Sequence, residues 1–134
     1  RGVTIVYYTA RPESLRDCTT RNLEAYGLPL ADSSLLLLND GTPASRKSRL
    51  RAELAKRYRI LLIVGDNLDD FVEGSRADPA ARRALAAQHG ARWGREWIIL
   101  PNPIYGHWEA SIYGFDRSLS RGERVDRKLQ HLSD

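Results

Sequence analysis

Apolar residues gather in four short runs, separated by segments of mixed polarity and turn residues. The runs cover residues 3–8, 35–38, 60–64 and 97–100. The first is rich in β-branched and aromatic residues, which favours a buried strand. The third is continuously apolar, a pattern typical of a parallel strand that is covered on both faces. Each run is far shorter than the roughly 20 apolar residues that a membrane-spanning helix needs. The pattern therefore predicts four strands.

The segments between and after these runs carry helix signals. Helices are predicted over residues 12–26, 45–58, 78–89 and 120–132. Leu50 and Leu54, four positions apart, mark the inner face of the second helix. Asp78-Pro79 is a typical helix start, with a capping residue followed by Pro, and Gly27 is a typical helix end. Alternating strands and helices predict an α/β fold with a parallel sheet.

Length and charge narrow the possible functions. The chain has 134 residues, which suits one domain, and 21 Lys and Arg against 17 Asp and Glu give a net charge of +4. Its densest basic run, 46–51, lies on a predicted helix and is explained by a solvated helix face. Zinc-finger spacing, an aromatic RNA-binding signature and a polybasic tail are all absent from the sequence. We therefore predict no nucleic-acid partner; the basic charge suits anionic small molecules such as phosphate esters.

The lone cysteine and the first residue are also informative. Cys18 is the one cysteine, so it cannot form a disulfide within the chain. The sequence holds no Met and begins at Arg1. We interpret it as a part of a longer polypeptide.

Acidic residues follow the third apolar run directly. Asp66, Asp69 and Asp70 lie within five positions, and such carboxylates repel one another unless a cation lies nearby. Ligands bind beyond the carboxyl ends of parallel strands, and Mg²⁺ is commonly held there by one or two carboxylates. The alternative, a helix N-cap, explains one residue of Asp66 and Asn67. We therefore interpret Asp66 as a metal ligand and Asp70 as its supporting neighbour.

Two residues near other strand ends could bind phosphate. Thr9 stands at the predicted end of the first strand, ahead of a helix N-terminus whose amides favour an anion. Its alternative role is a helix cap. Lys47, near the start of the second helix, could neutralise phosphate charge. It could also simply be solvated, as most lysines in proteins are. The order Thr, Lys, Asp after successive strands is more specific than any one of them.

Three segments resemble a known family: YTAR at 8–11, GDNLDDF at 65–71 and LPNPIYGHWE at 100–109. They resemble the haloacid dehalogenase (HAD) superfamily and, within it, the class C acid phosphatases, which include the lipoprotein-e type bacterial 5′-nucleotidases. The resemblance spans residues 3–109 and implies an α/β, HAD-like Rossmannoid three-layer fold with a parallel sheet. Residues 1–134 would be the C-terminal part of a single acid phosphatase domain, without its N-terminal nucleophile strand and any cap.

The resemblance also implies roles for the residues named above. Thr9 would hydrogen-bond the transferred phosphoryl group, and Lys47 would balance charge there, with Arg46 as a rival in the alignment. Asp66 matches the Mg²⁺ ligand, and Asp70 matches the accompanying acidic residue, beside the metal rather than bound to it. Ala10 departs from the family pattern, because many relatives have Asn at this place.

The third segment would contribute to substrate binding. Tyr105 matches an aromatic residue that stacks on the base of the substrate in the nucleotidases. Core packing is the alternative for Tyr105, although Gly106 and the Pro-bounded loop favour exposure. Asn102 would be a second substrate-binding residue, and with Trp108 and Glu109 it would shape the loop more than take part in catalysis.

Phosphatases of this superfamily attack phosphorus with an Asp of an Asp-x-Asp pair, forming an aspartyl-phosphate, and the second Asp acts as general acid and base. No two of the ten aspartates in this chain are separated by one residue. We therefore predict part of a Mg²⁺-dependent acid phosphatase, a phosphoric monoester hydrolase whose substrates would include nucleoside 5′-monophosphates. The chain as given would be inactive. The alternative is a non-catalytic fragment that binds phosphate or nucleotides.

The family resemblance extends to partners and location. The expected partner is a small-molecule phosphomonoester, and a homodimer is compatible with the family. Relatives are mostly periplasmic, anchored to the outer membrane or secreted. Any membrane attachment would come from an N-terminal lipid anchor outside these residues.

Overall fold

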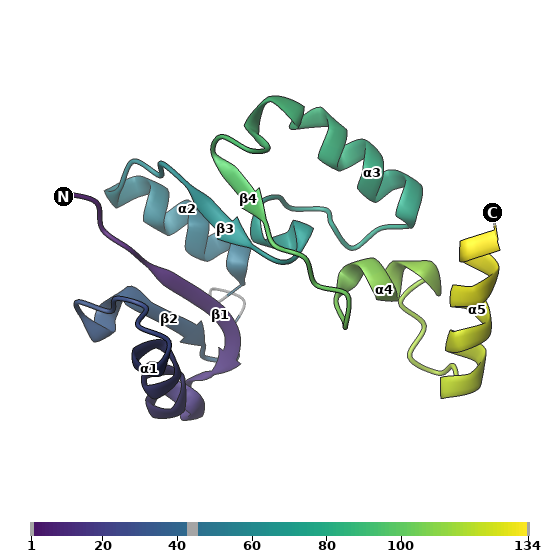
Figure 1. Cartoon of the computed structure of the whole chain (residues 1–134), viewed down its shortest axis with the longest axis horizontal. Helices are drawn as coiled ribbons and strands as arrows, with labels where there is room; N and C mark the ends of the chain where they lie inside the picture. The colour runs from purple at the N-terminus through teal and green to yellow at the C-terminus, as the bar shows by residue number, and fades with distance from the viewer. Residues whose placement is uncertain (1, 43–45, 134) are drawn as a thin grey trace. The chain divides into compact units, whose positions relative to one another are not determined.

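The computed structural model describes residues 2–42 and 46–133, which fall into two compact units, Arg1–Arg59 and Ile60–Asp134. Each unit contains one pair of parallel strands with helices around it (Figure 1). None of the helices in this described part has the length and apolar character that a bilayer crossing requires.

The first unit is built on β1 (Tyr7–Pro12) and β2 (Leu36–Asn39), which pair in parallel. Between them lie the 3₁₀ turn η1 (Glu13–Leu15), helix α1 (Arg16–Ala25) and the turn η2 (Ser33–Leu35), and helix α2 (Lys47–Arg57) follows β2. Side chains along β2 alternate, so that Leu36 and Leu38 are buried while their neighbours are half-buried. Leu54 of α2 is buried as well, on the face that the sequence predicted.

Helix α1 ends where its sequence predicts. The amide of Leu28 donates to the carbonyl of Leu23 at 2.8 Å, and the amide of Gly27 donates to the carbonyl of Glu24 at 2.9 Å. Gly27 has φ +65°, a backbone conformation that glycine adopts without steric cost. This double hydrogen bond satisfies the last carbonyls of the helix, as in a Schellman motif.

The second unit is built on β3 (Ile63–Gly65) and β4 (Trp97–Ile99), also a parallel pair. Its other elements are two turns, η4 (Leu68–Asp70) and η5 (Gly90–Arg92), and the helices α3 (Pro79–Gln88), α4 (His107–Ile112) and α5 (Arg121–Ser133). Leu68, Phe71, Val72 and Trp97 form its buried core. Aromatic rings pack there at short range, with the centroid of Phe71 5.0 Å from that of Trp93.

The predicted start of the first strand is wrong by four residues. Strand β1 begins at Tyr7, opposite Leu36, rather than at Val3, and it continues to Pro12 through an irregular register after Tyr8. Helix α1 correspondingly begins at Arg16 instead of Pro12. The reason is tertiary, because the extent of a strand depends on where its neighbour β2 offers hydrogen-bonding partners.

The expectation that residues 60–64 are covered on both faces is wrong for this chain. Only Ile63–Gly65 form strand β3, and Leu61, Leu62 and Val64 are 53, 51 and 51% exposed. Among the described residues, β3 pairs with β4 alone, so its other edge has no neighbouring strand. An apolar run of this kind is typical of the interior of a larger parallel sheet.

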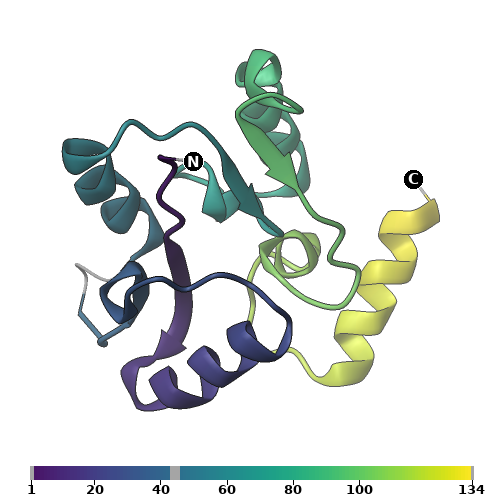
Figure 2. The ribbon, with the colours of Figure 1, turned by 60° about the vertical axis from the view of Figure 1, so that its left-hand side comes forward.

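The other predicted elements are confirmed, and one helix was not predicted. Asp78 caps α3 by accepting the amide of Ala81 at 2.9 Å, a hydrogen bond that lowers the pKa of the Asp78 carboxyl. Helix α4 lies in a segment predicted to be a loop, since Pro101, Pro103 and Gly106 are all helix-breaking signals. The tail forms α5, which lies beside α4 in both views of the ribbon (Figure 2).

Candidate functional site

The acidic turn, residues 65–70, follows β3 and is held by its own last carboxylate. Asp70 is only 4% exposed, and its Oδ2 accepts the backbone amides of Asp66 at 3.1 Å and Asn67 at 3.0 Å. Asn67 in turn accepts the amide of Asp69 with its side chain, which completes a capping box around η4. Asp70 therefore fixes the backbone that carries the Asp66 side chain.

Gly65 makes this arrangement sterically possible. A Cβ atom at position 65 would lie 2.6 Å from both Cβ and Oδ2 of Asp70, closer than real Cβ contacts come. The Asp70 side chain thus occupies the space that any larger residue at position 65 would need. Glycine is therefore required at position 65, because the Asp70 side chain approaches its backbone too closely for a Cβ atom.

A buried polar network supports the acidic turn from the side of α3. Ser75 Oγ donates to Asp69 Oδ1 at 3.2 Å, and the Arg82 guanidinium donates to the Ser75 carbonyl. Burial lowers the pKa of Arg82, and the charge of Asp69 acts in the opposite direction. Sequence analysis missed this network, since an arginine within a helical segment is normally solvated.

Asp66 itself faces outward at the carboxyl end of β3. Its carboxylate is exposed, and Oδ2 accepts a hydrogen bond from Asn102 Nδ2 at 2.8 Å. Asn102 follows the neighbouring strand β4, so two parallel strands bring together residues 36 positions apart. This is the edge of a parallel sheet at which ligands bind.

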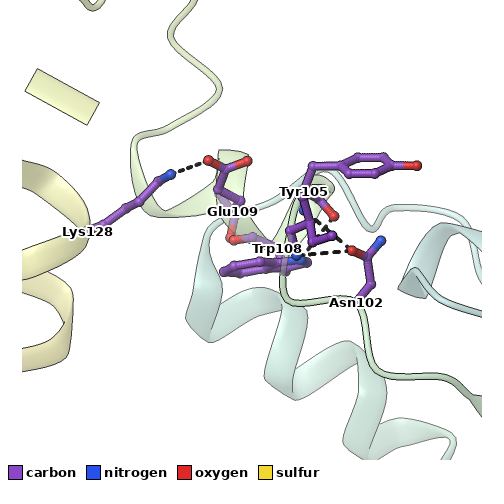
Figure 3. A network of polar contacts seen from close by, with 7 residues as sticks. Asn102, Tyr105, Trp108, Glu109 and Lys128 are labelled. Atoms are coloured by element: carbon purple, nitrogen blue, oxygen red, sulfur yellow. Dashed lines mark hydrogen bonds and ion pairs between the residues drawn. The ribbon is translucent and has the colours of Figure 1, made fainter. Parts of the chain in front are cut away.

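The aromatic loop, residues 102–108, begins at this same asparagine. Asn102 Oδ1 accepts the amides of Ile104 at 3.2 Å and Tyr105 at 3.4 Å, and Trp108 Nε1 donates to the Tyr105 carbonyl at 3.2 Å. The rings of Tyr105 and Trp108 point to opposite sides of the loop (Figure 3). Tyr105 is 66% exposed, so it is not a core residue.

Gly106 places the aromatic loop next to the acidic turn. Its φ is +142°, and a Cβ there would lie 3.2 Å from Asn67 Nδ2 and 3.2 Å from Trp108 Cδ1. Glu109 forms an ion pair with Lys128, which links α4 to α5 behind the loop (Figure 3). The loop thus combines a close backbone approach at Gly106 with a following helix, α4, that is held to α5.

Thr9 and Lys47 belong to the first unit. Thr9 lies within β1, and its Oγ1 accepts the amide of Arg11 at 3.3 Å. The predicted position of Thr9 directly ahead of a helix N-terminus is therefore wrong, since α1 begins seven residues later, at Arg16. Lys47 is the first residue of α2 and half-buried, and Arg46 is its exposed N-cap residue.

The second unit thus brings together four of the predicted site residues: Asp66, Asp70, Asn102 and Tyr105. Asp66 suits Mg²⁺ as a ligand, because it offers an exposed carboxylate whose orientation Asn102 fixes. Within residues 2–42 and 46–133, no group of three His, Cys, Asp or Glu side chains could hold a metal ion. Asp66 would therefore be one ligand, with phosphate, water or further carboxylates completing the set.

Residues 1–108 match the family model described as HAD superfamily, subfamily IIIB (acid phosphatase). The chain belongs to this acid phosphatase family. Two solved structures of the class C acid phosphatase from Bacillus anthracis are similar, one of them with tungstate bound. Both are 32% identical to this chain, with TM-scores of 0.85 and 0.87. Each match covers 96% of this chain and 54% of the solved chain, so the chain spans about half the length of these acid phosphatases.

This match confirms the predicted family and the HAD-like α/β fold. The acidic turn and the whole aromatic loop lie within the matched residues, which end at Trp108. Glu109 and α5 lie beyond the residues that the family model matches.

Proposed function

We propose that this chain provides the metal-binding and substrate-stacking part of a Mg²⁺-dependent acid phosphatase that hydrolyses phosphomonoesters. The observation that carries the proposal is the Asp66 carboxylate, exposed at the carboxyl end of β3, oriented by Asn102 and set on a backbone that Asp70 holds. Membership of the acid phosphatase family supports the reaction class, and HAD phosphatases generally use a divalent metal.

The chain's own residues would bind and orient the phosphate. Bound Mg²⁺ would offset the negative charge that repels an anionic attack on phosphorus. Asp66 would hold the ion, the Thr9 hydroxyl would donate to a phosphoryl oxygen, and Lys47 or Arg46 would balance the remaining charge. The attacking Asp-x-Asp pair is not found among these 134 residues, so we propose that the chain alone does not turn over substrate.

We further propose that the substrates include nucleoside 5′-monophosphates, with the base stacked on Tyr105. The exposed ring of Tyr105 lies on the loop that Asn102 connects to Asp66, which supports a substrate held by its phosphate at one end and its base at the other. The tungstate bound to the Bacillus anthracis enzyme is a tetrahedral oxyanion like phosphate, and it supports an oxyanion as the group recognised.

Removing the metal tests the reaction. The protein as its gene encodes it should hydrolyse p-nitrophenyl phosphate with Mg²⁺, lose this activity in EDTA and regain it when Mg²⁺ is added back, since the metal offsets charge in the transition state. The 134-residue chain, assayed in parallel, should release no phosphate. Phosphate or nucleotide binding without hydrolysis by the gene-encoded protein would instead favour the non-catalytic alternative.

Replacing Tyr105 tests the substrate class. Base–aromatic stacking contributes about 1–3 kcal/mol, so Tyr105→Ala should lower kcat/KM for AMP roughly 5- to 150-fold. Hydrolysis of p-nitrophenyl phosphate should change much less, and Tyr105→Phe should retain most of the activity towards AMP. Tyr26→Ala, at an exposed tyrosine of the first unit, is the matched control. Equal losses for both substrates would rule out base stacking as the role of Tyr105.

A further inference from the structure

Asn102 is hydrogen-bonded at both ends of its side-chain amide. Nδ2 donates to Asp66 Oδ2 at 2.8 Å, and Oδ1 accepts the backbone amides of Ile104 at 3.2 Å and Tyr105 at 3.4 Å. The amide is a rigid, planar group with two donors and one acceptor oxygen. Any change in the direction of the Asp66 carboxylate therefore acts on the same group that holds the backbone at Tyr105.

We infer that Asn102 is a positioning residue that couples the acidic turn to the aromatic loop. This inference rests on the proposed function and deepens it, because it makes the metal ligand Asp66 and the base-stacking residue Tyr105 parts of one unit. Asn102 then acts through both of them, by its hydrogen bonds to the Asp66 carboxylate and to the Tyr105 amide.

Two other contacts restrict the position of the loop backbone around Tyr105. Gly106 packs against the Asn67 side chain, since a Cβ at position 106 would come within 3.2 Å of Nδ2. Trp108 Nε1 holds the carbonyl of Tyr105 while Asn102 holds its amide, so the Tyr105 backbone is fixed on both sides. With both its amide and its carbonyl hydrogen-bonded, the Tyr105 backbone, from which the exposed ring projects, is held at a defined place relative to Asp66.

The coupling has a consequence for substrate selection. Orientation of Asp66 for the metal and orientation of Tyr105 for the base would be gained or lost together. In the gene-encoded protein, Asn102→Ala should raise both the Mg²⁺ concentration for half-maximal activity and the KM for AMP. Tyr105→Ala should raise the KM for AMP alone. This difference separates a positioning role from a simple loss of the stacking surface.

The direct test is NMR of the ¹⁵N-labelled 134-residue chain, without metal or substrate. The signals to follow are the side-chain NH₂ of Asn102 and the backbone amides of Ile104 and Tyr105. Asp66→Ala removes the acceptor of the Asn102 amide, so it should shift all three signals although residue 66 lies in another segment. Asn22→Ala, an asparagine on α1, is the matched control and should shift none of them.

Two substitutions at position 102 separate the two ends of the amide. Asn102→Asp turns the donor to Asp66 into a second carboxylate, which repels Asp66 in the absence of metal, so it should shift the loop amides. In an Asp66→Ala background that repulsion is gone and the acceptor for Ile104 and Tyr105 remains, so there Asn102→Asp should leave the loop amides almost unmoved. Asn102→Ala should shift the loop amides by itself. Asp66→Ala leaving the Asn102, Ile104 and Tyr105 signals unmoved in the wild-type background would overturn the inference. The NMR measurement requires neither turnover nor metal. If the NMR signals show the coupling but the gene-encoded protein shows no EDTA-sensitive hydrolysis, the proposed function is rejected and the coupling stands.

Discussion

Asp66→Asn should lower phosphomonoester turnover by the gene-encoded protein about a thousandfold or more. A metal ion contributes several kcal/mol of charge stabilisation in such reactions, and each ~1.4 kcal/mol corresponds to a factor of ten in rate. The neutral amide has nearly the same shape, and its oxygen can still accept the hydrogen bond that Asn102 donates to Asp66. The fold should therefore persist while metal binding is lost.

The assay for Asp66→Asn is kcat for p-nitrophenyl phosphate across a Mg²⁺ titration. Asp126→Asn, at an exposed aspartate of α5 in the same unit, removes one negative charge away from the acidic turn and is the matched control. Unchanged kcat in Asp66→Asn, or an equal loss in Asp126→Asn, would show that Asp66 has no special role in the reaction.

Gly65→Ala should strongly destabilise the second unit. The new methyl group would meet the Asp70 side chain at 2.6 Å, and moving that side chain would break its hydrogen bonds to the amides of Asp66 and Asn67. Hydrogen bonds to charged groups contribute about 1.5–3 kcal/mol each. We therefore expect a loss of about 3 kcal/mol or more in the free energy of unfolding.

Urea denaturation followed by tryptophan fluorescence measures this loss, because Trp93, Trp97 and Trp108, the three tryptophans of the chain, all lie in the second unit. Gly90→Ala is the control, since a Cβ there meets nothing within 4 Å. The double variant Gly65→Ala/Asp70→Gly should be no less stable than Asp70→Gly, because the whole clashing side chain, its Cβ included, is gone. Equal midpoints for Gly65→Ala and Gly90→Ala would contradict the close packing of Gly65 on Asp70.

Much of the fold follows from local sequence signals. Asp78-Pro79 and Gly27 mark helix ends by their own chemistry, and both predictions are confirmed. The start of β1 could not be predicted in the same way, because it depends on its pairing with Leu36, 29 positions after Tyr7. The exposure of residues 60–62 could not be predicted from the hydrophobic pattern either, because the run has the composition of a strand covered on both faces.

The candidate site shows the same division between local and tertiary information. Asp66 and Asp70 could be assigned different roles from their spacing, and the structure places one at the surface and buries the other. Asn102-Pro103 indicates a turn, which explains the bonds from Asn102 to Ile104 and Tyr105. Nothing local indicates the bond to Asp66, because it arises where β3 and β4 lie side by side.

Binding of a divalent cation at Asp66 can be measured directly with Mn²⁺, which broadens the NMR signals of nearby nuclei. Mn²⁺ is added to the ¹⁵N-labelled 134-residue chain in the presence of inorganic phosphate. We expect the strongest broadening at the amides of Asp66 and Asn67 and at the side chain of Asn102, and we expect Asp66→Asn to abolish it. Broadening centred on other carboxylates, or equal broadening in Asp66→Asn, would contradict a metal site at the acidic turn.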